Sequence, residues 1–93
     1  MSEYFTMEVQ PTSDPDTVEL ITNQTLTEQD EEIYTTPQAG EVGSPIAQTI
    51  FFAVDGIQAL TLIEDTLIVT RQPNYSWEAI IDEIRDALRD FFL

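Results

Sequence analysis

The chain has 93 residues and a mass of 10.6 kDa, which suits one small domain, residues 1–93. Eighteen acidic residues face three Arg and no Lys, so the formal net charge is −15 at pH 7. The absence of Cys and His excludes disulfides, thiolate or imidazole catalysis, and metal sites built from these side chains. Nucleic acid is not an expected ligand, because phosphate contacts need Lys or Arg and the first 70 residues contain neither.

The composition favours a folded domain over a disordered acidic tail. Apolar residues make up 42% of the chain and aromatic residues 10%, which is more than a solvated acidic tail carries. A domain of this size buries only about 60% of its unfolded surface, so we expect modest stability that added salt increases. Three causes of the acidic surplus stay open: a halophilic source, a basic partner, or ordinary selection for solubility.

No segment predicts contact with a membrane. The start of the chain lacks the basic and apolar regions of a signal peptide. The longest apolar run, Ile50–Val54, has five residues, whereas a helix needs about 20 to cross a bilayer. We therefore expect a protein without membrane contact, with the cytoplasm as its default location.

The N-terminal quarter predicts two paired strands. Residues 4–10 alternate apolar and polar side chains, which is the period of a half-buried strand. Residues 11–16 interrupt this pattern with two prolines and two aspartates, and residues 17–22 then alternate again. We expect the two strands to pair through this proline-bearing turn.

Residues 23–43 form an acidic, loop-rich segment. It holds five carboxylates, no basic residue, Pro37 and two glycines. A structureless loop of this length is uncommon in a compact domain, so residues 33–36 are interpreted as a short strand within it.

The second half predicts a helix, a hairpin and a last helix. Ser44 and Pro45 are typical of a helix start, and Gly56 of its left-handed stop. Residues 57–63 and 66–71 are β-branched runs split by a two-residue turn. Ser76 can cap a last helix that runs to the chain end and buries Trp77, Ile80, Ile81, Ile84, Leu88 and Phe91. The expected fold is α+β: a two-layer ββαββα domain with an antiparallel sheet and both helices on one face.

A row of acids on the last helix is the feature most like a functional site. Its members are four residues apart, which places neighbouring carboxylates on one outer face: Glu78, Asp82, Asp86 and Asp90. Oxygen ligands of this kind suit hard cations. The favoured interpretation is a solvated face that Arg85 and Arg89 partly neutralise.

The other candidates have structural explanations. Asp14 and Asp16 are turn formers around Pro15, and the acidic run 30–32 suits a solvated loop that could steer a basic partner. Ser44 has no His to activate it, and no phosphate-binding loop is present. Trp77 is interpreted as a core anchor. We therefore expect no enzyme activity and no cofactor.

Three segments together resemble the N-terminal domain of the Nfu/NifU-type iron–sulfur scaffold proteins. The first, residues 10–20, is similar to the family's proline-bracketed turn and second strand. The second begins with Ser-Pro-Ile-Ala at residues 44–47, similar to the family's Ser-Pro-Leu-Ala helix start, and continues to residues 55–57. The third is Asp-Thr-Leu-Ile-Val-Thr-Arg at residues 65–71, followed by Trp77. The resemblance runs from about Met7 to the chain end and implies the same two-layer fold.

Two departures limit what the resemblance implies. Full-length members carry a second domain whose Cys-x-x-Cys pair holds the cluster, and this chain has no Cys, so it cannot hold a cluster by that means. Glu19 also stands where the family usually has Lys, which puts in doubt any partner that reads positive charge there. The family's N-terminal domain is regarded as an accessory module and implies no catalytic residue.

The resemblance therefore implies a non-catalytic adaptor that contacts a cysteine-bearing iron–sulfur scaffold or client protein. We expect the protein to be a monomer. The expected partner-binding residues lie in the turn and at the first helix start: Asp14, Pro15, Asp16, Ser44 and Pro45. The alternative is a carboxylate-based module that binds iron or another hard cation through the row from Glu78 to Asp90. A fragment of a longer chain, or a domain whose family role has decayed, also stays open.

Overall fold

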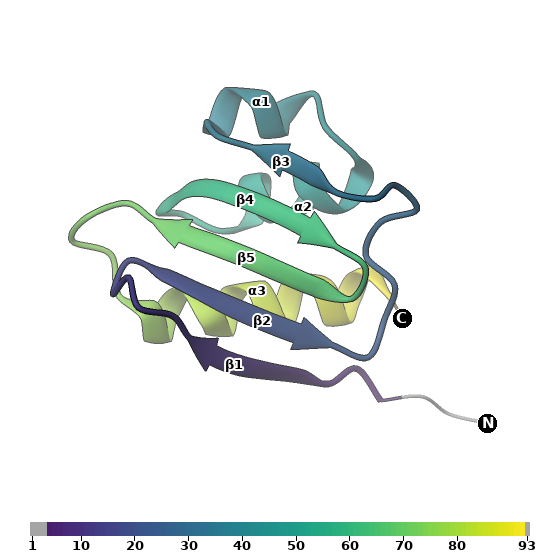
Figure 1. The fold of residues 1–93 in the computed structure, drawn as a ribbon, viewed down its shortest axis with the longest axis horizontal. Helices are drawn as coiled ribbons and strands as arrows, with labels where there is room; N and C mark the ends of the chain where they lie inside the picture. Colours follow the sequence, from purple (N-terminus) through teal and green to yellow (C-terminus); the bar gives the residue numbers. More distant parts are fainter. Residues whose placement is uncertain (1–3, 93) are drawn as a thin grey trace.

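The computed structural model describes residues 4–92 as a five-stranded antiparallel sheet with three helices (Figure 1). The elements in chain order are β1 (Met7–Pro11), β2 (Thr17–Thr22), β3 (Glu32–Tyr34), α1 (Pro37–Glu41), α2 (Pro45–Ala53), β4 (Ile57–Ile63), β5 (Thr66–Arg71) and α3 (Trp77–Phe91). The predicted α+β class and the predicted order of the four long strands and two long helices are confirmed.

Two local hairpins make up most of the sheet, whose strand order is β1-β2-β5-β4-β3. β1 pairs with β2 through the proline-bearing turn, and β4 pairs with β5, as the sequence predicts. The hairpins join where β2 lies antiparallel to β5, with Leu20 opposite Leu67. Every neighbouring pair is antiparallel, so no crossover helix between parallel strands is needed.

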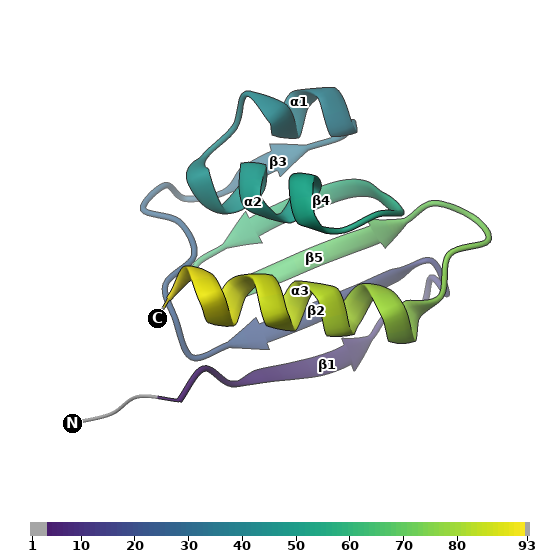
Figure 2. The same cartoon turned by 180° about the vertical axis from the view of Figure 1, so that it is seen from behind.

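The helices α2 and α3 lie against one face of the sheet (Figure 2), and the opposite face carries no helix (Figure 1). The core lies between these layers, where alternate strand positions meet the buried stripes of the two helices. Its largest fully buried side chains are Leu20, Ile50, Leu60, Leu62, Leu67, Val69, Ile80, Ile84 and Leu88. The covered face of the sheet therefore supplies most of the hydrophobic stabilisation.

Serine caps begin both long helices. The Oγ atoms of Ser44 and Ser76 accept hydrogen bonds from the backbone N–H groups of Ala47 and Ala79, each at 3.4 Å. Such caps satisfy backbone donors that have no partner within the helix. The predicted stop of α2 is partly wrong: the helix ends at Ala53, and Gly56 adopts its left-handed φ of 91° in the turn beyond it.

The acidic segment differs from its prediction. The strand within it, β3, covers Glu32–Tyr34 rather than residues 33–36, and the short helix α1, which Thr36 caps, was not predicted. A Cβ atom at Gly40 would lie 1.9 Å from the Phe51 ring, so this glycine lets α1 approach α2 closely. The segment therefore contains two short elements, β3 and α1, rather than one continuous loop.

Smaller differences occur at the ends of the chain. β1 begins at Met7, later than the predicted residue 4. Phe91 was predicted to be buried but is 40% exposed, and Phe92 packs against the core in its place and stacks on Phe5 with ring centroids 6.1 Å apart. Within residues 4–92, no helix combines the length and the hydrophobicity that crossing a bilayer requires.

Candidate functional site

The turn between β1 and β2 is the first predicted contact site, and hydrogen bonds hold it rigidly. The Asp14 carboxylate accepts from the backbone N–H of Asp16 at 2.9 Å and from the Thr17 hydroxyl at 3.2 Å. Thr12 adds a hydroxyl bond to the Thr17 carbonyl at 2.8 Å. Short polar side chains of this kind commonly stabilise turns by bonding the backbone two residues on. Asp14 and Pro15 nevertheless remain exposed to solvent.

The same turn is fastened to the start of α3. The Trp77 indole N–H donates to the Pro15 carbonyl at 2.8 Å, and Arg71 Nε lies 3.0 Å from Asp16 Oδ1. The Arg71 guanidinium also lies 5.3 Å from the centroid of the Trp77 ring. Trp77 packs against the core, in agreement with its interpretation as an anchor. Its indole N–H is satisfied within the protein, as is usual for a Trp that is partly buried.

The second predicted contact site, Ser44–Pro45, adjoins a buried carboxylate. The Glu32 side chain accepts hydrogen bonds from the hydroxyls of Thr27 and Tyr34, both at 2.5 Å. Tyr34 Oη in turn accepts from the backbone N–H of Ser44 at 3.0 Å. This cluster fixes the acidic segment to the start of α2, so Ser44 has a structural role both here and as the helix cap.

Burial and hydrogen bonding oppose each other at Glu32. Burial alone would raise the pKa of its carboxyl, because desolvation disfavours the charged form. The side-chain hydroxyls of Ser44, Thr27 and Tyr34 outweigh that effect and hold the pKa of the Glu32 carboxyl below its ordinary value. Glu32 is therefore a charged group within the fold, and its partners are already in place.

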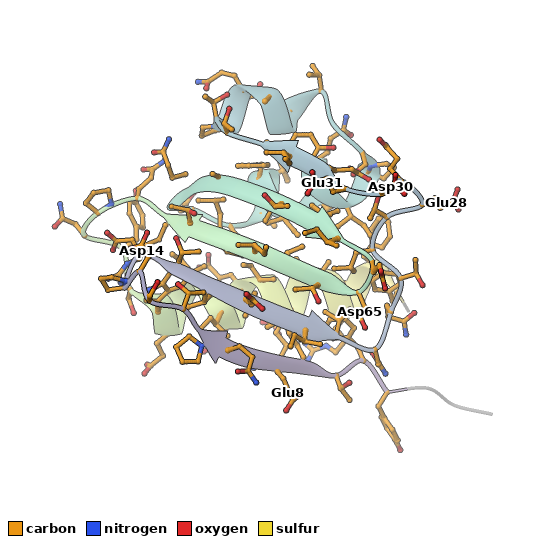
Figure 3. All side chains as sticks on the ribbon, viewed as in Figure 1. Glu8, Asp14, Glu28, Asp30, Glu31 and Asp65 are labelled. Atoms are coloured by element: carbon orange, nitrogen blue, oxygen red, sulfur yellow. The ribbon has the colours of Figure 1, made fainter. Side chains whose placement is uncertain are left out.

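The two predicted contact sites lie at opposite ends of the domain. The turn contacts Trp77 at the start of α3. Ser44 and Pro45 instead line a hollow of about 260 Å³ together with Phe91 and Phe92, which lie at the end of α3. Helix α3 has 15 residues, which corresponds to a length of about 22 Å. Figure 3 shows Asp14 at the margin of the sheet far from the end of α3. The predicted residues thus form two separate patches.

The acid row on α3 does not converge on a cation position. Asp82 lies 3.3 Å from Arg85 and Asp86 lies 2.9 Å from Arg89, both as exposed ion pairs one helical turn apart. Across residues 4–92, the structure contains no group of three or more acidic, His or Cys side chains that could hold a metal ion. Asp82 and Asp86 thus have arginine partners on their own helix, and the interpretation of the row as a solvated, partly neutralised face stays a prediction.

Sequence reasoning missed a hollow between α1 and α2. It has a volume of about 600 Å³, and Phe51, Phe52 and Pro37 contribute to its lining. The Phe52 side chain is 93% exposed. The signal was present in the helical spacing, because Phe52 falls outside the stripe that contains Ile46, Ile50 and Val54.

Comparison with known proteins identifies the family. A sequence model described as the N-terminal domain of the scaffold proteins Nfu/NifU matches residues 7–93. The chain belongs to this family. The match begins at the first residue of β1, so every strand and helix of the domain lies within it.

A relative and three solved structures extend this result. The chain is 28% identical over 82 residues to conserved virulence factor C of Staphylococcus saprophyticus; the alignment covers 88% of the chain and 21% of that protein. The chain thus spans about a fifth of the length of this relative.

The solved structures share the fold at low sequence identity. A NifU-like protein from Saccharomyces cerevisiae matches with a TM-score of 0.76 and 19% identity, covering 94% of this chain and 77% of that one. Protein SAV1430 from Staphylococcus aureus matches with a TM-score of 0.70 and 13% identity, covering 92% and 99%. SeR13 from Staphylococcus epidermidis matches with a TM-score of 0.56 and 16% identity, covering 90% and 94%.

Proposed function

We propose that this domain is a non-catalytic adaptor in iron–sulfur cluster assembly, which contacts a cysteine-bearing scaffold or client protein without holding a cluster itself. The family match over residues 7–93 is the observation that carries this proposal. The ligand chemistry supports it, because the 93 residues offer no thiolate or imidazole to iron. In this role, a partner supplies the cluster ligands and the domain supplies surface.

The two patches predicted from the sequence are the proposed contacts. At one end, Asp14 and Pro15 are exposed on a turn that internal hydrogen bonds already hold in one conformation. At the other end, Pro45 is exposed beside the hollow near Phe91. A rigid surface loses little conformational entropy on binding, which favours such positions as contacts.

The test is capture of the tagged protein from its own cells, with partners identified by mass spectrometry. Cluster scaffolds or iron–sulfur enzymes should be enriched over a tagged control protein of similar charge. Cells that lack the protein should lose part of their iron–sulfur enzyme activity while enzymes without clusters keep theirs. Unchanged iron–sulfur enzyme activities together with no enrichment would reject the proposal.

The contribution of the turn can be tested by removing charge without removing structure. Asp14→Asn keeps a side-chain oxygen that can accept from the Asp16 N–H, so the turn should persist. Capture should fall in this variant if the turn carries the contact. Asp90→Asn on α3 changes the net charge equally and is the matched control. Equal capture by both variants would exclude the Asp14 charge from the interface.

A further inference from the structure

The face of the sheet opposite the helices is unusual for a surface in contact with water. We define the open sheet face by six half-buried side chains at its centre: Ile21, Thr61, Ile63, Thr66, Ile68 and Thr70. Strand pairing places them next to one another, with Ile68 between Glu19 and Thr61 and Thr66 between Ile21 and Ile63. An antiparallel sheet with one solvated face normally alternates apolar residues inward with polar residues outward. Here isoleucine occupies outward positions on β2, β4 and β5.

Acidic side chains lie beside and around these six residues. Glu8 and Glu19 occupy outward positions on β1 and β2, and β3 adds Ile33, which is 57% exposed. Figure 3, which looks onto this face, shows Glu8, Asp14 and Asp65 at different margins of the sheet. Further carboxylates, Glu28, Asp30 and Glu31, lie together at one corner of the same view.

No positive side chain of residues 4–92 belongs to this face. Ile68 and Thr70 lie on the open side of β5. The next residue, Arg71, therefore lies on the covered side, where it pairs with Asp16. Arg85 and Arg89 lie on α3 in the other layer. The open sheet face therefore has isoleucine and threonine at its centre, its ionised groups are acidic, and Arg85 and Arg89 lie in the layer behind it.

These observations indicate the chemistry of what covers the face. A second copy is disfavoured, because two identical faces would bring carboxylates against carboxylates. Five strands about 4.8 Å apart and about 17 Å long give a projected area of roughly 400 Å², which suits a small interface. Both arguments favour a transient complex with a different protein.

We propose that the open sheet face docks a protein partner whose contact surface has aliphatic side chains at its centre and Lys or Arg at its rim. The aliphatic contact with Ile21, Ile63 and Ile68 supplies affinity, and the carboxylates of Glu8 and Glu19 steer and orient the basic rim. This inference rests on the proposed adaptor function, since it gives the adaptor a docking surface apart from its two ends.

Site-specific photocrosslinking in the source cells tests the proposal. p-Benzoylphenylalanine is placed at Thr61 or Thr66 on the open sheet face, and at Phe52 on α2 or Glu83 on α3 for comparison. The sheet positions should give crosslinks at several times the yield of the other two, to partner peptides that contain aliphatic and basic residues. Crosslinks mainly from Phe52 or Glu83, crosslinks to a second copy, or none from the sheet would overturn the proposal.

Two double variants with the same change in net charge distinguish an effect of charge on the open sheet face from an effect of the overall charge. Glu8→Lys/Glu19→Lys should reduce crosslinking from Thr61 by about fivefold or more, and Glu83→Lys/Asp90→Lys, with the same change in net charge, should leave it within about twofold. Ile68→Thr should also reduce the yield while the circular dichroism spectrum stays native. An equal loss in both lysine pairs would reject specific docking on this face.

The outcomes also separate the docking proposal from the proposed function. Crosslinks from the sheet positions to basic proteins unrelated to iron–sulfur clusters would support the docking surface and contradict the proposed role in cluster assembly. Crosslinks to cluster scaffolds or clients from positions 52 or 83 alone would support the adaptor function and contradict docking on the open sheet face.

Discussion

The two faces of the sheet differ in their strand residues as well as in their surroundings. Leu67 and Ile68 are neighbours on β5; the first is fully buried beneath the helices, and the second is only half-buried on the open side. The covered face is closed by α2 and α3, whereas nothing within residues 4–92 closes the open one. The covered strand positions are mainly leucine and valine, whereas the open positions mix isoleucine with threonine and glutamate. The helices therefore cover the face whose strand residues are the more apolar, and the isoleucines of the other face stay half-buried.

β3 reverses the polarity of the two faces. Glu32 lies opposite Leu62 on the covered side and is 7% exposed, while Ile33 lies on the open side. Hydrogen bonds from Thr27 and Tyr34 make a buried carboxylate tolerable there. The edge strand thus joins a polar cluster inside the domain to an aliphatic position outside it.

The largest expected effect comes from truncating neighbours on opposite faces. Leu67→Ala should lower the free energy of unfolding by about 3 kcal/mol, because it leaves a cavity in the core. Ile68→Ala should lower it by about 1 kcal/mol, since its surroundings are open to water. Urea unfolding followed by Trp77 fluorescence measures both. Equal losses would show that the open sheet face is as well packed as the core.

The buried carboxylate gives the next largest effect. Glu32→Gln should lower the free energy of unfolding at pH 7 by about 1–2 kcal/mol, because an amide cannot accept from both hydroxyls with its two terminal atoms. Glu31→Gln, an exposed neighbour, should change it by less than about 0.5 kcal/mol. Chemical unfolding of the two variants side by side makes the comparison.

The pH dependence sharpens this test. The folded pKa of Glu32 lies below its unfolded value, so its contribution is fully present above the unfolded pKa and is lost as pH falls through the folded pKa. Below about pH 5, the free energy of unfolding of the Glu32→Gln variant should therefore fall less steeply with decreasing pH than that of the original protein. An unchanged acid limb of the stability profile would contradict the assigned pKa direction.

A smaller effect is expected where the turn meets α3. Trp77→Phe removes the hydrogen bond to the Pro15 carbonyl, which water can partly replace, so the loss should be about 1 kcal/mol or less. Amide hydrogen exchange in residues 12–17 should speed up more than exchange in β4. Tyr75→Phe, an exposed aromatic change nearby, is the control and should leave this exchange unaltered.

The smallest effect is expected on the acid row. Asp82→Asn/Asp86→Asn removes two exposed ion pairs and should change the free energy of unfolding by less than about 1 kcal/mol. Calorimetric titration with Fe²⁺ should give the same weak, non-saturating heat for the variant and the original protein. Saturable binding that disappears in the variant would instead support the cation-binding alternative.

The sequence predicted most of the fold because its signals were local. Alternation identified β1 and β2, β-branched runs split by a two-residue turn identified β4 and β5, and the serine caps at Ser44 and Ser76 located α2 and α3. The details of the acidic segment were not predictable in this way. The strand β3 is held in place by the hydrogen bonds that Glu32 accepts, and the helix α1 can pack against Phe51 only because residue 40 is glycine. Both contacts depend on the tertiary structure.

The candidate site was harder to predict than the fold. Spacing could not show that Asp14 and Ser44 lie at opposite ends of α3, since their separation depends on how the hairpin turns back over the helix. Alternation assigned faces only in the first two predicted strands. It could not show that Ile21, Ile63 and Ile68 form one surface, because that requires the pairing of β2 with β5.

The pairing of β2 with β5 also bears on how the domain folds and varies. Each hairpin closes locally, but this seam joins Ile21 to Thr66 and Thr17 to Thr70, residues far apart along the chain. Forming the seam closes one long loop, and this non-local step should limit the rate of folding. Because the entropy of loop closure grows slowly with length, extra residues in the connection between β2 and β3 would cost little, about 0.6 kcal/mol per doubling. Length differences among relatives should therefore concentrate in that connection, while the two hairpin turns keep their size.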